Sequence, residues 1–219
     1  PNSDINKSKP IIKNPLKNLI TVFKEEKIKK LSLAFFIYFI AFTGLTNILI
    51  FFLQESLNWT TKASSGTLVV VGIIAIIVQG GLIGPLVKQF GEMRLTLIGS
   101  GFILVACALL ITAPKENATI NIYSAVSFLA VGAGLITPTL RALISKKLDV
   151  DKQGSILSNL QGLQSLGGVL GIAMAGRVYD SFGPKSPFIA GSVILLFMIY
   201  LIAEGKNNNS FNNQKSKVF

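Results

Sequence analysis

The chain has 219 residues, of which 50% are hydrophobic and only 14% are charged, well below the roughly 25% of charged residues in soluble domains. A soluble protein of this length has too little interior to cover so much apolar surface. The formal net charge of +11 would suit a nucleic-acid partner, but the charges cluster outside long apolar runs and their distribution follows a membrane topology. Composition therefore excludes an ordinary soluble domain and argues against nucleic acid as the partner.

The first 30 residues are predicted to form a basic cytoplasmic linker. Residues 1–14 are polar and interrupted by proline, which is typical of a flexible segment. Between residues 15 and 30, apolar side chains recur at helical spacing among lysines: Leu16, Leu19, Ile20 and Phe23. This pattern predicts an amphipathic helix at the membrane surface.

Six apolar runs follow, each about long enough to cross a bilayer as a helix. They cover residues 31–53, 66–87, 95–113, 120–143, 155–176 and 187–203. In lipid the backbone must satisfy its own hydrogen bonds, so such runs become helices. The sequence thus predicts an all-α polytopic membrane protein with a six-span domain over residues 31–203 and a disordered cytoplasmic tail over residues 204–219.

The distribution of basic residues sets the orientation. If the N-terminal segment is cytoplasmic, six spans place all 21 Lys and Arg residues on the cytoplasmic side except Lys62, Lys115, Arg177 and Lys185. Basic loops stay in the cytoplasm. We therefore expect a multi-pass protein of the cell (inner) membrane, with the lipid bilayer as its surroundings and both ends of this chain in the cytoplasm.

The six runs differ in polarity. The third and sixth are apolar nearly throughout, whereas the other four carry polar or small residues at depth and must face protein or water. We therefore expect the third and sixth spans on the outside and a substrate pathway lined from the other four. The candidate lining residues are Tyr38, Thr43, Asn47, Gln79, Gln161, Gln164 and Ser165. The alternative is that these amides bond between helices and touch no substrate.

Small residues four apart favour close packing of membrane helices. Such pairs are Gly80 with Gly84, Ala130 with Gly134, and Gly167 with Gly171. Pro138 removes one backbone donor in the fourth run and should bend it, as a shape adjustment or as a hinge.

The loop GPLVKQFGEMR joins the second and third runs. Gly84 and Gly91 permit a tight reversal, and Lys88 and Arg94 hold the loop in the cytoplasm. The loop resembles the pattern G-x-x-x-D-[RK]-x-G-[RK]-[RK] of the major facilitator superfamily. Both glycines match, whereas the charges do not: Lys88 stands where the pattern has Asp. This suits the weaker second copy of the loop, between helices eight and nine.

The resemblance extends to GAGLITPTLRALISKKLDVDKQGSILSNLQGLQSLGGVLGIAMAGRVYDSFGPKSPF, which is similar to helices ten to twelve of the drug-efflux branch that includes tetracycline exporters. It implies that this chain forms helices seven to twelve of a twelve-helix fold, with an N-terminal six-helix half as its partner. The implied function is transport of a small molecule by alternating access, as an efflux permease without a cofactor or a metal.

No Asp or Glu lies deep in a run, so proton coupling would need a group in the other half.

Two functions other than transport remain open at this stage. With no histidine and no embedded carboxylate, a membrane-embedded enzyme is disfavoured. A non-transporting assembly factor or sensor on the same fold remains an alternative.

Overall fold

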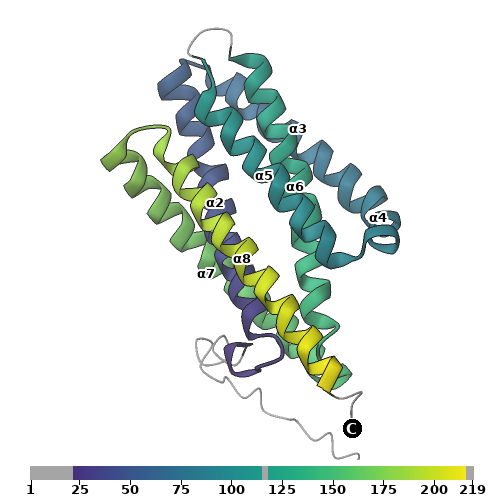
Figure 1. Cartoon of the computed structure of the whole chain (residues 1–219). Helices are drawn as coiled ribbons and strands as arrows, with labels where there is room; N and C mark the ends of the chain where they lie inside the picture. Colours follow the sequence, from purple (N-terminus) through teal and green to yellow (C-terminus); the bar gives the residue numbers. More distant parts are fainter. Residues whose placement is uncertain (1–21, 115–117, 216–219) are drawn as a thin grey trace, which may run out of the picture.

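Nearly all of the described chain is helical. The computed structural model describes residues 22–114 and 118–215, with side chains as far as Glu204. Its elements are α2 (Lys29–Leu57), α3 (Thr61–Ile77), the π-helix η1 (Val78–Leu82), α4 (Ile83–Phe90), α5 (Glu92–Thr112), α6 (Thr119–Ser145), α7 (Val150–Phe182) and α8 (Ser186–Lys215). The helices lie beside one another as a bundle (Figure 1). The predicted all-α class is confirmed, and no strand occurs among the described residues.

The helices correspond to the six predicted runs, with α3, η1 and α4 joined into one continuous helix. Five helical stretches are long and apolar enough to cross a membrane. The fifth run became α7, which is long enough at 33 residues but is not among those five because its glutamines and serines lower its hydropathy. Five spans are therefore supported by both length and composition, and the sixth, α7, by length alone.

The sequence predictions for the two ends of the chain can be compared with the structure only at the C-terminal end. Most of the predicted basic linker, residues 1–21, lies outside the described residues. At the other end α8 continues to Lys215, whereas the sequence predicted a disordered tail from residue 204. Gly205 and the asparagines after it are residues that often end helices, but no proline follows Ala203, and the helical bonding of the last span continues through them.

The bundle consists of two packed groups. Helix α2 packs against α7 and α8, while α5 packs against α6, which also contacts α3. Contacts between α5 and α8 join the groups, and an edge-to-face pair of Phe52 and Phe188 strengthens the contact of α2 with α8. The second span is the least covered: its apolar stretch is 11% buried, against 44% for α5 and 33% for α8. This burial is that of the chain alone and does not test which spans face lipid beside a second half, so the outer position of the third and sixth spans stays a prediction.

Glycines allow the closest helix crossings. A methyl group added to Gly171 of α7 would lie 2.2 Å from the carbonyl oxygen of Ile40 in α2. One added to Gly132 of α6 would lie 2.6 Å from the carbonyl oxygen of Gly99 in α5. Lipid tails are as apolar as the side chains, so such close backbone contact is a main source of helix association in a bilayer.

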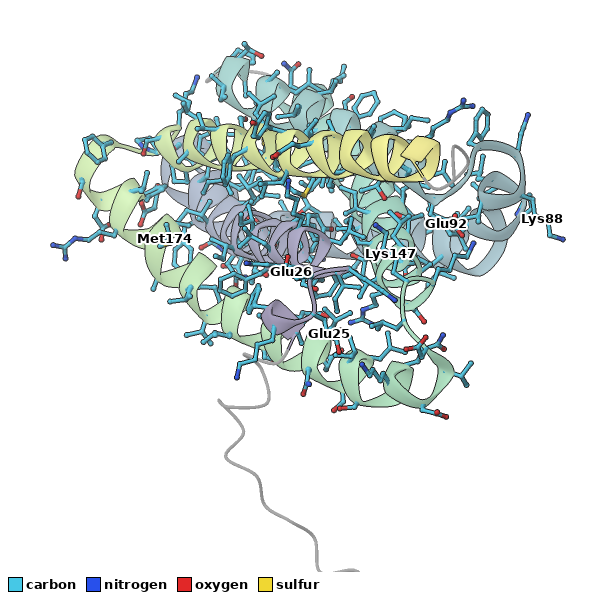
Figure 2. The ribbon with its side chains drawn as sticks, turned by 60° about the horizontal axis from the view of Figure 1, so that its bottom comes forward. Glu25, Glu26, Lys88, Glu92, Lys147 and Met174 are labelled. Carbon is cyan, nitrogen blue, oxygen red and sulfur yellow. The ribbon has the colours of Figure 1, made fainter. Side chains whose placement is uncertain are left out.

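Ion pairs link the helix ends that the sequence predicts to be cytoplasmic. Lys30 pairs with Glu204 at 2.7 Å, Lys152 pairs with Glu25 at 2.8 Å, and Lys146 pairs with Glu92. Figure 2 shows Glu25, Glu92 and Lys147 on this end of the bundle. The hydrogen bond from Lys152 lowers the pKa of the Glu25 carboxyl, which keeps it ionised. The pairs join α2 to α8, α6 to α5, and α7 to the residues before α2.

Topology is the first testable prediction. Lys62 and Lys88 lie near opposite ends of a helical stretch of 30 residues, about 45 Å long, so they should lie on opposite sides of the membrane. Reporter domains fused after Lys62 should be active outside the cytoplasm, and those fused after Lys88 or Lys147 should be active inside. Cytoplasmic activity of the Lys62 fusion would contradict the predicted orientation.

Candidate functional site

A charged side chain lies among the polar residues that the sequence predicted at depth. Nη2 of Arg141, on α6, donates to Oε1 of Gln161 at 2.8 Å and to Oε1 of Gln164 at 2.5 Å. Both glutamines come from α7. The guanidinium lies over the ring of Phe35 on α2, 5.9 Å from its centroid, within the range of a cation–π contact.

A second polar contact lies one turn deeper. The hydroxyl of Tyr38 is 3.3 Å from the hydroxyl of Thr137, and the Tyr38 side chain is fully buried. Its ring stacks on Phe42 at 5.5 Å. We call the group formed by Phe35, Tyr38, Thr137, Arg141, Gln161 and Gln164 the arginine cluster; it joins α2, α6 and α7.

Local sequence explains this arrangement. Thr137 and Arg141 are four residues apart on α6, and Gln161 and Gln164 are three apart on α7, so each pair shares one helix face. Pro138 cannot donate to the carbonyl of Gly134, which removes one bond from the α6 ladder. Gly167 of α7 lies against the backbone of Phe36, so α7 approaches α2 closely just beyond Gln164.

Two other predicted pathway residues bond along their own helices. Asn47 donates its amide to the carbonyl of Thr43 at 2.9 Å, and the Ser165 hydroxyl donates to the carbonyl of Gln161 at 3.2 Å. Thr43 itself lies next to Gly168 of α7. Asn47 and Ser165 are exposed in this chain, and among the described residues their side chains bond to backbone carbonyls rather than to the polar side chains of the arginine cluster.

Gln79 lies in the π-helical turn η1 and is exposed. The structure does not bring it to the arginine cluster. Gly80 and Gly84 nearby have nothing within 4 Å of an added methyl group, so their predicted packing role has no partner within the described chain and stays a prediction. Gly134, in contrast, packs against the side chain of Val78 and fixes η1 on α6.

The predicted cytoplasmic loop is a single sharp reversal. Gly91 separates α4 from α5 with φ 75° and ψ 158°, a region that is essentially restricted to glycine. Lys88 and Arg94 are exposed. Glu92, directly after the turn, forms the ion pair with Lys146, so a carboxylate at this loop contacts the end of α6.

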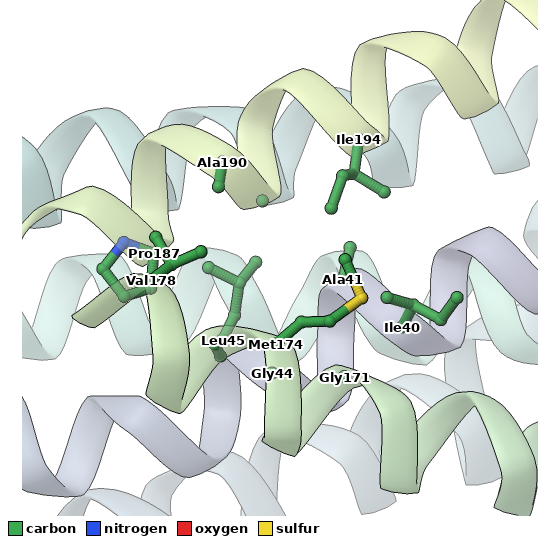
Figure 3. A pocket seen from close by; sticks show the side chains of 12 residues that line it. Ile40, Ala41, Gly44, Leu45, Gly171, Met174, Val178, Pro187, Ala190 and Ile194 are labelled. Carbon is green, nitrogen blue, oxygen red and sulfur yellow. The ribbon is translucent and has the colours of Figure 1, made fainter. Parts of the chain in front are cut away.

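An apolar pocket between α2, α7 and α8 lies on a different part of the bundle. Glycines and apolar side chains alone line it, including Met174, which lies across it (Figure 3). It has no polar group with which to orient a polar ligand. In the described part of the chain no group of three or more His, Cys, Asp or Glu residues could hold a metal ion.

Comparison with known proteins identifies the fold. A family model described as "Major Facilitator Superfamily" matches residues 1–172. The chain belongs to the major facilitator superfamily. As a member of this superfamily, with five helices able to span a bilayer by length and composition, it is a multi-pass membrane protein.

Individual proteins similar to this chain share between 22% and 26% of its residues over the matched regions. The tetracycline resistance protein of class H from Pasteurella multocida is 26% identical over 74% of this chain and 40% of its own length. The class C protein from Escherichia coli is 26% identical over 59% of this chain and 32% of its own length. The human hippocampus abundant transcript-like protein 1 is 22% identical over 87% of this chain and 41% of its own length. This superfamily member therefore spans less than half the length of these relatives.

The reversal at Gly91 is expected to matter more than the charges of this superfamily loop. A valine at Gly91 would have to adopt a backbone conformation that costs about 1–3 kcal/mol for a residue with a side chain. Lys88 is exposed and makes no ion pair among the described residues. If the full-length protein transports a substrate, Gly91→Val should therefore reduce transport more than Lys88→Ala does, as measured at matched expression. Equal losses of transport in the two variants would show that the charge of Lys88 matters as much as the backbone turn at Gly91.

The sequence analysis counted Arg141 only among the cytoplasmic basic residues, but the structure shows it binding two glutamines of α7. One signal was available: Arg141 lies four residues after Thr137 and so shares a face with a polar residue at depth. Its glutamine partners are 20 and 23 residues further along the chain. Periodicity within one helix does not indicate a contact between two helices, so this contact was missed.

Proposed function

We propose that this chain is the C-terminal six-helix half of a secondary transporter that moves a small molecule by alternating access. In this proposal it acts as an efflux permease of the inner membrane, with both ends of the chain in the cytoplasm. The observation that carries the proposal is the arginine cluster, in which three helices of an apolar bundle bring polar side chains together. Transporters of this kind bind substrate near the bilayer midplane, where the two halves meet.

The exposed face of α7 supports a second half. Ser158, Gln161 and Ser165 are spaced three and four apart and are all exposed in this chain. Polar groups at membrane depth face protein or a water-filled cavity. A partner half across this face would leave the arginine cluster next to a central pathway, and membership of the superfamily favours that arrangement over an enzyme.

Tetracycline is the first substrate to test, because two similar proteins are named for resistance to it. Cells that produce the full-length protein containing this chain should accumulate less tetracycline, or less of another drug in a mixed panel, than cells with an empty vector. Reconstitution of the purified protein in liposomes then separates transport from an indirect effect. Equal accumulation across the panel, together with inactive liposomes, would favour the non-transporting assembly factor or sensor.

A further inference from the structure

The arginine cluster carries a positive charge that has no counter-ion among the described residues. Four ion pairs occur among the described residues, and they involve Lys29, Lys30, Lys146 and Lys152. Arg141 takes part in none of them; its described partners are two neutral amides and an aromatic ring. An arginine does not lose its proton in proteins, and an uncompensated charge in a membrane domain is costly.

The donors of the cluster outnumber its acceptors. Nη2 of Arg141 serves both glutamines, Nε is buried without a partner, and Nη1 forms no hydrogen bond within the described chain. Nη1 is also absent from the buried unpartnered atoms, so it reaches the open surface. The guanidinium offers only donors, so both glutamines turn their oxygens toward it and their amide NH₂ groups away. Neither NH₂ group has an acceptor in the described chain.

We propose that Arg141, together with the amide groups of Gln161 and Gln164, binds one carboxylate of the transported molecule. This inference rests on the proposed transport function and names the substrate class of the same site. One guanidinium balances the single charge of a carboxylate and would leave a phosphate dianion half compensated.

Benzoate and its neutral analogue benzamide test the proposal. Both are titrated against the full-length protein in lipid nanodiscs, and binding is measured as protection against thermal unfolding. Benzoate should raise the melting temperature of the wild-type protein, and benzamide should not. Arg141→Gln should weaken benzoate binding at least tenfold, the effect of losing about 1.4 kcal/mol from a charge-assisted contact. Lys88→Gln removes an exposed charge elsewhere and should leave benzoate binding unchanged.

Several results would overturn the proposal. These are equal protection by benzamide, unchanged benzoate binding in Arg141→Gln, or no protection of the wild-type protein by benzoate. The carboxylate that binds Arg141 could instead be a side chain of the second half. The melting temperatures measured without ligand distinguish this case from a substrate carboxylate. In that case Arg141→Gln would leave a buried carboxylate without a partner, and the melting temperature of the ligand-free protein would fall markedly. Such a drop, without benzoate protection, would assign the anion to the protein itself.

Transport measurements separate this inference from the proposed function. A wild-type protein that transports neutral or cationic compounds, with the same rates in Arg141→Gln, would overturn the carboxylate site and leave the transporter standing. A protein that binds benzoate through Arg141 and transports nothing would overturn the transport function and leave the binding site.

Discussion

Replacing Gly171 by valine is expected to abolish the folded form of the protein or to lower its melting temperature severely. The first carbon of any side chain at this position would lie 2.2 Å from the carbonyl oxygen of Ile40 and 3.1 Å from the backbone nitrogen of Gly44. Both neighbours are backbone atoms of α2, so no side chain can rotate away. The helices would have to separate, and the crossing beneath the apolar pocket would be lost (Figure 3).

The matched control lies on the same helix. Gly176→Val places an equal side chain on α7, where nothing lies within 4 Å. Overpacking in a close-packed region costs about 1–3 kcal/mol and sometimes more, and direct backbone contact puts Gly171→Val at the upper end. The measurement is the yield of monodisperse protein by size-exclusion chromatography, followed by thermal unfolding of the same samples. Equal yield and equal melting temperature for the two variants would contradict the close crossing of α2 and α7.

The elements of this fold follow from the sequence because the physics of a bilayer leaves few options. A run such as residues 95–113 has no water with which to share its backbone bonds, so it forms a helix, observed as Glu92–Thr112. The reversal at Gly91 was also predictable, since a bend between two long helices requires a residue that tolerates positive φ. The end of α8 was not, because Gly205 and the asparagines after it are typical of a helix end, yet the helix continues through them to Lys215.

Packing partners were predicted less well than elements. Gly167 and Gly80 each begin a pair of small residues four apart, yet only Gly167 meets another helix within the described chain. The spacing shows that a helix can be approached closely, but it does not show which helix approaches it. Gln161 and Gln164 were predicted as pathway residues and lie in the arginine cluster, while Asn47 bonds to its own helix because its short side chain reaches the carbonyl four residues back.

This chain alone, residues 1–219, is expected to insert into the membrane and to transport nothing. In our proposal it lacks the N-terminal half of the transporter, so the polar face of α7 and the exposed surface of the second span have no partner. Each amide left in lipid without a hydrogen bond costs about 1–3 kcal/mol. Co-expression of the N-terminal half as a separate polypeptide should cover these faces and restore transport, because the two halves need only non-covalent contact to form the pathway.

Drug accumulation is measured in cells that make this chain, the N-terminal half, both pieces, or the intact protein. Only the last two should show reduced accumulation, and membrane fractionation should show that the single pieces are present at comparable levels. Carrying Gly91→Val in the co-expressed chain serves as a control, because it should reduce the restored transport without removing the chain from the membrane. Transport by residues 1–219 alone would mean that two copies cover each other's polar faces and form the pathway as a homodimer. The face carrying Ser158, Gln161 and Ser165 would then be a self-association surface, and the proposal of a missing half would be wrong.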